Sequence, residues 1–358
     1  MFNLSQQPFG LDISDYSIEI ISLGGPVEKP RLLAMAGTAL EPGVVENSEI
    51  LNKEKLKDAL ESLMKNPDFG RIKTKKIIFS IPESKTLINI FEPPQSLNKQ
   101  KEPEFISSQA EKIFPYPLKE LCLDFRISGK EVLLIAVPRN IINGFLEVFK
   151  SCQLQPLALG IESESLASAL TVKQEAPVLI LDIGVKTSNF SVFDKKGLRM
   201  SISSEIAGNN FTQALSEKLK ISFQKAEILK RKTGLDPEPE QGKVFLILQK
   251  EIQGIIRQIK EIEDYFWQKE GGKIEKIILA GGSAMLPHLP EYLSDNLENE
   301  VTVGDPWKKI NIDILKKKEY FKKALQVNPV LYSTAVGSAL RGLTKNPQKA
   351  GINLLRGV

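Results

Sequence analysis

The stretch that decides the fold is Val178-Leu-Ile-Leu-Asp-Ile-Gly-Val-Lys-Thr-Ser-Asn-Phe-Ser-Val-Phe193. Its apolar ends and small polar centre predict a buried strand, a tight turn and a second strand. Asp182 stands at the tip of the first strand, and Gly184 and Thr187 stand in the turn. Such a turn presents backbone N–H groups to an anion, and a carboxylate beside it suits a hydrated Mg²⁺ that bridges phosphate oxygens. Taken alone, the pattern is more often that of an ordinary hairpin than of a phosphate loop.

A second copy of this pattern stands near the N-terminus, in Phe9-Gly-Leu-Asp-Ile-Ser-Asp-Tyr-Ser-Ile-Glu-Ile-Ile21. The alignment pairs Asp12 with Asp182, Ser14 with Gly184, and Ser17 with Thr187. The separation is close to half the chain, which is too long for a solenoid repeat and indicates a duplicated domain. Two such turns on the two sides of a cleft would hold a polyphosphate between them.

A third motif is Lys276-Ile-Ile-Leu-Ala-Gly-Gly-Ser-Ala-Met285. It reads as a strand that ends in Gly281, Gly282 and Ser283 and is followed by an amphipathic helix. Glycines between the end of a strand and a helix let a flat ligand lie directly on the backbone.

The three motifs, in this order, resemble the two phosphate loops and the adenosine loop of the actin-like ATPase superfamily. The resemblance narrows to the type IV pilus assembly protein PilM family, which is related to the cell-division protein FtsA. It rests on stretches spread over most of the chain: Gln109–Leu118, Val132–Pro138, Gly160–Leu170, Ile278–Pro287 and Tyr332–Arg341. It implies an α/β, actin-like ATPase fold, that is, a duplicated ribonuclease H-like fold with an inserted subdomain 1C of the FtsA and PilM type.

With the hydrophobic periodicity, this resemblance predicts helices over about 48–65 and 244–268. It also predicts the following domains: 1–84, subdomain 1A; 85–152, the inserted subdomain 1C; 153–176, a return to 1A with the helix between the halves; 177–208 and 274–306, subdomain 2A; 209–273, subdomain 2B; 307–345, a linker and C-terminal helix; 346–358, a flexible tail.

The resemblance implies ATP and Mg²⁺ as ligands. The residues that would hold Mg-phosphate are Asp12, Ser14, Ser17, Asp182, Gly184 and Thr187, with the two aspartates reaching Mg²⁺ through water. Gly281, Gly282 and Ser283 would hold the nucleoside, and Glu227 and Lys230 would close over the adenine. Glu162 and Glu164 begin the helix between the halves, where a carboxylate either acts as a general base on water or caps the helix.

The first phosphate loop departs from the family pattern. Ser14 replaces a glycine, Asp15 adds a carboxylate, and Glu19 stands where the family has a lysine. If Glu19 faces the phosphates, it repels them. If it faces solvent, the loop loses one cation without a direct clash. In both cases at most a weak ATPase is expected, and nucleotide binding is favoured over turnover.

The end of the sequence, Ile352-Asn353-Leu354-Leu355, resembles the N-terminal Ile-Asn-Leu-Leu-Pro peptide by which the membrane protein PilN docks onto PilM, except that Arg356 replaces the proline. One interpretation is that the tail occupies the same groove, in its own molecule or in a neighbour. The other is a disordered end. The resemblance implies a PilN-type inner-membrane partner, and self-association through the tail or the 1C region is a further option.

Bulk composition agrees with a globular protein: of 358 residues, 42% are hydrophobic and 26% are charged. A formal net charge of +4 gives nucleic-acid binding no support, and two cysteines are too few for a disulfide framework, which fits a reducing cytosol. No apolar run approaches the roughly 20 residues that a membrane-spanning helix needs.

The sequence therefore predicts a cytoplasmic, actin-like nucleotide-binding scaffold of a type IV pilus or type II secretion-like assembly machine, held at the inner membrane through its partners. Two alternatives stay open. One is an FtsA-like, membrane-associated cell-division filament protein, and the other is a small-molecule kinase of the same superfamily, for which no aspartate base stands out.

Overall fold

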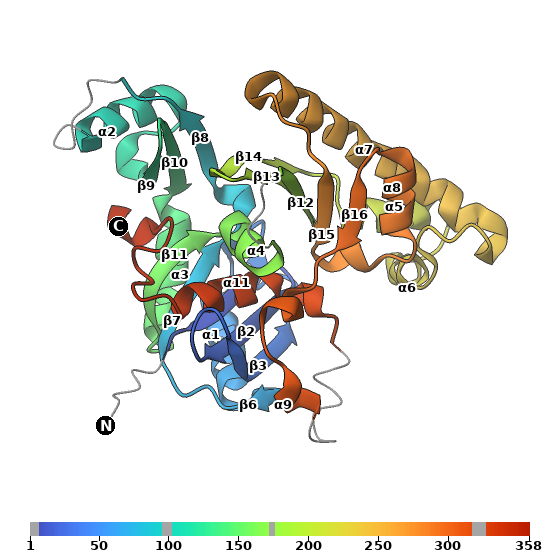
Figure 1. Cartoon of the computed structure of the whole chain (residues 1–358). Helices are drawn as coiled ribbons and strands as arrows, with labels where there is room; N and C mark the ends of the chain where they lie inside the picture. Colours follow the sequence, from blue (N-terminus) through green and yellow to red (C-terminus); the bar gives the residue numbers. More distant parts are fainter. Residues whose placement is uncertain (1–6, 95–101, 172–175, 317–326) are drawn as a thin grey trace. The chain divides into compact units, whose positions relative to one another are not determined.

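The computed structural model describes residues 7–94, 102–171, 176–316 and 327–358 (Figure 1). The chain folds into two compact units, one formed by Met1–Thr171 with Asp305–Val358 and the other by Val172–Gly304. Each unit has its own sheet and its own core, and each is described by itself below. The subdomain borders expected within these units stay a prediction.

The main sheet of unit 1 has the strand order β11-β7-β1-β2-β3-β6. The bounds are β1 (Phe9–Ile13), β2 (Ser17–Gly24), β3 (Arg31–Ala39), β6 (Phe69–Gly70), β7 (Lys76–Ile81) and β11 (Gln155–Ile161). Strands β1, β2, β3 and β6 pair antiparallel, whereas β7 runs parallel to both β1 and β11. Because β11 is at the end of this order, it is an edge strand with one row of backbone groups turned away from the sheet.

Helix α1 (Lys53–Lys65) begins later than the predicted start near residue 48. Asn52 is its N-cap and accepts a hydrogen bond from the Lys55 N–H at 3.0 Å. The apolar residues before it belong to a short hairpin of β4 (Val45–Glu46) and β5 (Glu49–Ile50), so the sequence periodicity ran across a turn.

The core of unit 1 joins helices to the main sheet. The Phe79 ring on β7 lies 4.8 Å and 5.1 Å from the rings of Phe145 and Phe149 on α3 (Arg139–Ser151). Helices α4 (Glu162–Leu170) and α11 (Ser333–Gly342) meet so closely that a Cβ on Gly337 would lie 1.9 Å from the Ser165 carbonyl oxygen. Contact at that distance requires glycine.

A second sheet in unit 1 has the order β8-β10-β9, with β8 (Leu87–Phe91), β10 (Glu131–Pro138) and β9 (Leu121–Ser128) all antiparallel. Helix α2 (Glu102–Ile113) packs on one face of it through Ile106 and Ala110. Leu121 and Leu123 on β9 belong to that apolar cluster. Since side chains alternate along a strand, the intervening β9 residues face the opposite side, and β9 is itself an edge strand.

Unit 2 repeats the strand arrangement of unit 1 in the order β14-β13-β12-β15-β16. Its strands are β12 (Val178–Ile183), β13 (Ser188–Asp194), β14 (Gly197–Ser204), β15 (Lys276–Ala280) and β16 (Glu300–Val303). Its helices are α5 (Gly208–Leu219), α6 (Phe223–Thr233), α7 (Lys243–Glu270) and α8 (Leu289–Asn296). In both units a pair of antiparallel hairpins adjoins two parallel strands, which confirms an actin-like duplication.

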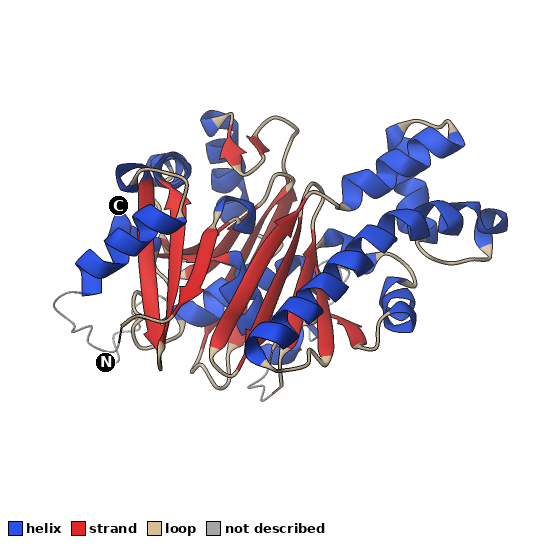
Figure 2. Cartoon of the chain, turned by 90° about the horizontal axis from the view of Figure 1, so that it is seen from above, coloured by secondary structure: helices blue, strands red, loops and turns tan. Residues whose placement is uncertain are grey.

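Long helix α7 packs on the sheet of unit 2 (Figure 2). Its predicted apolar stripe, from Ile252 to Phe266, is buried, and the Gln258 amide donates to the Ser204 hydroxyl of β14 at 2.9 Å. Unit 1 also contains α9 (Asp313–Lys316) and several short 3-10 turns, the last of which is η8 (Leu354–Gly357). Over the described ranges, no helix has both the length and the apolar character needed to cross a bilayer.

Candidate functional site

The Asp182 turn of unit 2 is fixed to the start of helix α5. Within the turn, the Gly184 N–H donates to the Thr187 carbonyl at 3.0 Å. The Gly208 N–H at the helix start then donates to the Gly184 carbonyl at 3.0 Å, and the next N–H of the helix donates to the Val185 carbonyl at 2.8 Å. Turn and helix are therefore one connected piece of backbone.

The glycine motif lies directly against this turn. A Cβ on Gly281 would stand 2.2 Å from Asp182 Oδ1, and Gly281 has a φ of +78° that favours glycine. The Ser283 hydroxyl donates to the Gly184 carbonyl at 3.5 Å. Asp182, Gly184, Thr187 and the glycines of the third motif, which are far apart in sequence, thus meet in one place within unit 2.

Lys230 joins the same cluster from helix α6. Lys230 is 4% exposed, and its Nζ donates to the Gly208 carbonyl at 2.9 Å and to the Thr212 hydroxyl at 2.7 Å. The ammonium also pairs with Glu227 at 2.7 Å. The buried Lys230 ammonium, paired with the partly buried Glu227, therefore holds α6 against the start of α5.

The pKa values of this pair follow from burial and from hydrogen bonds. Burial lowers the pKa of Lys230, because it penalises the ammonium, and Glu227 opposes that change. Burial raises the pKa of Glu227, but hydrogen bonds from Lys230, Thr212 and Arg231 outweigh it and bring the pKa to about 2. Glu227 is therefore ionised near neutral pH.

The corresponding turn in unit 1 is closed by its own side chains. The Ser14 hydroxyl accepts from the N–H groups of Tyr16 at 3.2 Å and Ser17 at 3.1 Å, and lies 3.2 Å from the Ser17 hydroxyl. The Asp15 carboxylate accepts from the N–H groups that follow β4, at 2.7 Å and 2.8 Å. The extra carboxylate thus organises a neighbouring hairpin, and Ser14 occupies the turn donors that a phosphate would use.

Glu19 lies opposite Asp12 in the β1–β2 pairing, as Asn189 lies opposite Asp182 in unit 2. The alternative in which Glu19 faces solvent is wrong, because Glu19 is 7% exposed. Burial, with Asp12 second, raises its pKa well above the ordinary value, although a hydrogen bond with Ser17 opposes this. A protonated Glu19 is neutral and adds no negative charge beside Asp12.

The two glutamates at the start of α4 are bound to other parts of unit 1. Glu162 accepts a hydrogen bond from the Glu83 N–H at 2.8 Å, while Glu83 accepts from the Ser163 N–H at 3.2 Å. Glu164 pairs with Arg126 of β9 and accepts from the Ile352 N–H at 3.3 Å. The catalytic role of these glutamates stays a prediction.

The segment expected to be a flexible tail is folded onto unit 1. Ile352, Asn353 and Leu354 are buried, and turn η8 packs on β9 and β11 (Figure 1). We name this place the tail groove and define it by Asp124, Arg139, Leu159, Glu164 and Arg341, which contact the tail. The interpretation as a disordered end is wrong because these contacts satisfy most polar groups of the segment.

Asn353 is the centre of the tail groove. Its Oδ1 accepts from the Leu159 N–H on the edge of β11 at 3.0 Å, and its own N–H donates to Asp124 Oδ2 on β9 at 2.6 Å. Arg341 Nη1 donates to the Ile352 carbonyl at 2.6 Å, and Arg356 pairs with Asp124 at 3.2 Å. Asn353 therefore bridges the edges of two different sheets.

The sequence analysis did not identify the residues of the tail groove that bind the tail. Asp124 and Arg126 are alternate residues of β9, so both lie on the face opposite the α2 cluster. Two charges on one face of a largely apolar strand were a usable signal of a polar contact there. Leu159 had no such signal, because it contributes only its backbone N–H.

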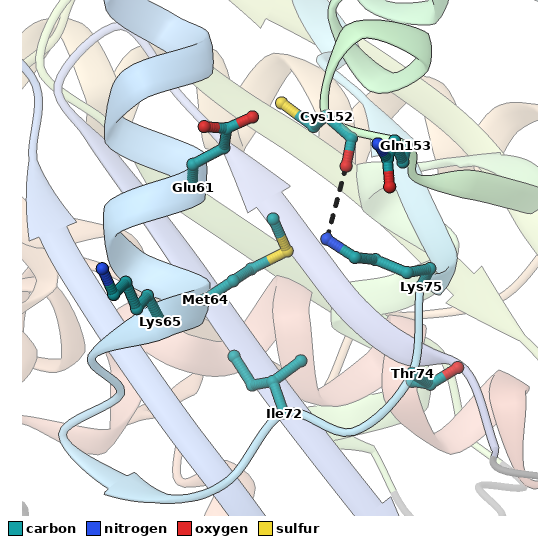
Figure 3. A pocket seen from close by; sticks show the side chains of 8 residues that line it. All are labelled: Glu61, Met64, Lys65, Ile72, Thr74, Lys75, Cys152 and Gln153. Atoms are coloured by element: carbon teal, nitrogen blue, oxygen red, sulfur yellow. Dashed lines mark hydrogen bonds between the residues drawn. The ribbon is translucent and has the colours of Figure 1, made fainter.

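Another hollow in unit 1, of about 340 Å³, lies apart from all predicted site residues (Figure 3). It is lined by Glu61, Met64, Lys65, Ile72, Thr74, Lys75, Cys152 and Gln153. Lys75 Nζ donates to the Cys152 carbonyl at 3.4 Å. Among the described residues, no group of three or more His, Cys, Asp or Glu side chains is placed to hold a metal ion.

Comparison with solved structures agrees with the fold. The structure of a PilM-PilN type IV pilus biogenesis complex superposes with a TM-score of 0.81 at 20% identity, over 94% of this chain and 99% of that one. MreB5 of Spiroplasma citri bound to ADP superposes with a TM-score of 0.53 at 12% identity, over 94% of this chain and 96% of that one. At these identities the likeness shows the actin-like fold alone.

Comparison by sequence is more specific. The cell division protein FtsA of Bacillus subtilis is 26% identical over 205 residues, which are 50% of this chain and 44% of FtsA. The chain therefore spans less than half the length of this curated relative. The family model described as type IV pilus assembly protein PilM matches residues 10–343, nearly the whole chain. A match of that extent, on an actin-like fold with its two aspartate turns, shows that this chain belongs to the type IV pilus assembly protein PilM family.

Proposed function

We propose that the chain is a scaffold of a type IV pilus or type II secretion-like machine that binds the N-terminal Ile-Asn-Leu-Leu-Pro peptide of a PilN-type inner-membrane protein in the tail groove. The observation that carries this proposal is that the chain's own Ile352-Asn353-Leu354-Leu355 fills that groove through specific contacts. A partner of this kind would hold the scaffold at the cytoplasmic side of the inner membrane. The solved PilM-PilN complex supports the choice of partner.

The groove contacts suit a peptide from another chain as well as the tail. Asp124 and Arg341 bind main-chain groups of the tail, which any peptide offers. The Leu159 N–H requires a peptide side chain with an acceptor atom, which Asn353 Oδ1 provides in the tail. The place where Leu354 is buried requires an apolar side chain at the next peptide position. Main-chain contacts give affinity and side-chain contacts give specificity, as in other peptides that bind at sheet edges.

Proline in place of Arg356 removes three contacts. The first is the ion pair with Asp124, in which the Arg356 side chain is half-exposed. The others are the hydrogen bond from Arg356 Nη2 to the Gln348 carbonyl at 2.8 Å and the one from the Arg356 N–H to the Asn353 carbonyl at 3.0 Å. A partly exposed ion pair contributes little, about 0–1 kcal/mol. The Asn contacts, which are buried, remain available to the proline-containing peptide.

The test is binding of a fluorescent Ile-Asn-Leu-Leu-Pro peptide to a tail-released variant, defined as Asn353→Ala with Leu354→Asp. We expect saturable binding, and a loss of at least tenfold when the peptide Asn is replaced by Ala. Asp124→Ala in the tail-released variant should weaken binding similarly, whereas Ser128→Ala, at the exposed end of the same strand, should not. Absence of binding by a folded tail-released variant would refute the proposed function.

We also propose that Mg-ATP binds to the scaffold and shifts it between conformations that differ in their affinity for the partner peptide. In unit 2, the residues that would hold the nucleotide are Asp182, Gly184, Thr187, Gly281, Gly282 and Ser283, supported by Glu227 and Lys230. The bare backbone of Gly281 beside the Asp182 carboxylate fits such a ligand, because a Cβ there would fill the space. In unit 1, Asp12, Ser14 and Ser17 remain candidate Mg-phosphate ligands, and the Ser14 hydroxyl already accepts from two N–H groups of their turn.

Calorimetric titration with Mg-ATP tests the nucleotide proposal. We expect binding by the wild-type chain and a loss with Asp182→Ala, while Asp194→Ala, at the far end of β13, serves as the control. Heat that is unchanged by Asp182→Ala would place the nucleotide elsewhere. In this proposal the nucleotide acts by binding alone, and the scaffold does not need to hydrolyse ATP.

A second candidate is an FtsA-like filament protein, which the 26% identity to FtsA favours. Such a protein would sediment with ATP and lipid vesicles. A PilM-type scaffold would remain in the supernatant unless its partner peptide were attached to the lipid. Sedimentation with plain and peptide-bearing vesicles therefore separates these two functions.

A further inference from the structure

We propose that residues 351–358 are an intramolecular plug, which keeps the tail groove closed until a partner peptide displaces it. This inference rests on the proposed function, because the plug and the partner would compete for the same groove. It adds a regulatory device: the scaffold would bind its partner only after its own tail has left.

The groove lies where two sheet edges approach each other. Strand β11 ends the order of the main sheet, and β9 ends the order of the small sheet. The tail uses both: Asn353 accepts from the Leu159 N–H of β11, and a Cβ on Gly357 would lie 2.6 Å from the Leu123 backbone nitrogen of β9. Edge strands keep unpaired N–H and C=O groups, so this place is built to receive a segment of chain.

An empty groove is costly because it leaves buried charges unmatched. Asp124 is a buried carboxylate that accepts from the Asn353 N–H and pairs with Arg356. Arg341 gives its Nε to the Pro347 carbonyl at 2.9 Å and its Nη1 to the Ile352 carbonyl at 2.6 Å. Removing residues 351–358 would leave Asp124 without these partners and Arg341 without the Ile352 carbonyl, and buried charges that lose partners are strongly destabilising. The groove therefore requires an occupant, either the tail or a replacement.

The tail is held by contacts that can be lost together. Turn η8 is a single short 3-10 turn, and Val358, which follows it, is 55% exposed. Every hydrogen bond across the groove within the described part of the chain involves at least one side chain, and no backbone ladder joins the tail to a strand there. A partner peptide that makes the same contacts would keep the buried groups paired, so the tail can be exchanged for it while the sheets stay folded.

Because the tail is covalently attached to unit 1, it can fill the groove even if its own affinity for the groove is weak. The tail follows α11 after a short connection, so its effective concentration at the groove is on the order of 1 mM. If the isolated tail peptide binds with a Kd of about 10 μM, the docked and free states stand at about 100 to 1. A partner peptide would then bind the wild-type chain about 100-fold more weakly than a chain with a released tail.

The experiment compares the fluorescent Ile-Asn-Leu-Leu-Pro peptide on three full-length chains: wild type, the tail-released variant, and Lys349→Ala as the control. Lys349 is exposed and contributes only backbone contacts. We expect the tail-released variant to bind at least tenfold more tightly than the wild type, with Lys349→Ala equal to the wild type. The Kd of an isolated peptide copy of residues 351–358 on the tail-released variant should predict the size of this difference.

Each result has one meaning. Equal affinity of the wild type and the tail-released variant overturns the plug and leaves the proposed function standing. No binding to a folded tail-released variant overturns the proposed function and the plug with it. A second readout follows hydrogen exchange of the Asn353 and Leu355 amides in the wild type: saturating peptide should accelerate it, and unchanged exchange with peptide bound would place the peptide outside the tail groove.

Discussion

At the scale of single residues, the unit 1 turn replaces an expected cation with a buried acid. Glu19 and Asp12 are opposite one another on paired strands, so their side chains share one face. A Cβ on Gly37, the partner of Glu19 on β3, would lie 2.3 Å from the Tyr332 hydroxyl, so Tyr332 covers this face. The pKa of Tyr332 is raised, first by burial and then by Glu19. The acid thus sits in an enclosed place that favours its neutral form.

We predict that Glu19→Gln removes a pH dependence of stability. The folded-state pKa of Glu19 is raised, so its contribution is full below the ordinary value near 4.5 and is lost as the pH rises through the folded pKa. Urea unfolding between pH 4 and 8 should therefore show the wild type losing more stability than Glu19→Gln. Glu28→Gln, at an exposed turn, is the control, and parallel curves for the wild type and Glu19→Gln would contradict the prediction.

Glu227 should show the opposite sign. Its folded pKa of about 2 lies below the ordinary value of 4.5, so its stabilisation is present above pH 4.5 and is lost as the pH falls toward 2. Glu227→Gln should lower the stability of unit 2 at pH 7, by on the order of 2 kcal/mol, and flatten this acid dependence. Acid titration followed by circular dichroism measures it, with Glu251→Gln on α7 as the matched control. A steep acid slope retained in Glu227→Gln would contradict the assignment.

At the scale of elements, the strand–turn–strand pattern and its repeat predicted the fold because they are local. Apolar alternation and a turn of small residues suffice to form the hairpins β1–β2 and β12–β13, and their burial confirms it. The start of α1 was misplaced because Ile50 and Leu51 continue an apolar spacing through a hairpin. The tail groove could not be assembled from sequence, since Asp124, Leu159 and Asn353 meet only through tertiary packing.

Two glycines separate backbone strain from steric contact. Gly271, at the end of α7, has a φ of +69° and open space around its Cβ position, whereas Gly281 has a φ of +78° and Asp182 Oδ1 at 2.2 Å. Gly271→Ala should cost about 1–2 kcal/mol for the left-handed backbone alone. Gly281→Ala should cost more and should also weaken Mg-ATP binding, as chemical unfolding and calorimetry would measure. Equal costs would show that the Asp182 carboxylate and the Ile183 carbonyl, 2.6 Å from the same Cβ position, both move away without cost.

At the scale of the whole molecule, each unit has a sheet and a core of its own, so each should unfold as a separate cooperative transition. Leu60 on α1 and Leu215 on α5 are fully buried in different units. Leu60→Ala and Leu215→Ala should each cost about 2–5 kcal/mol and should each lower a different calorimetric transition. A single transition that both variants lower equally would mean that the units unfold together.

The position of the tail across β9 and β11 has a consequence for biosynthesis. Bare sheet edges template pairing with other chains, and here two of them meet at one groove. If a partner peptide binds in this groove as proposed, the tail is a stand-in for that peptide on a newly made chain. The same eight residues would thus act as a self-contained chaperone, which guards the edges against aggregation and yields them only to a better-fitting peptide.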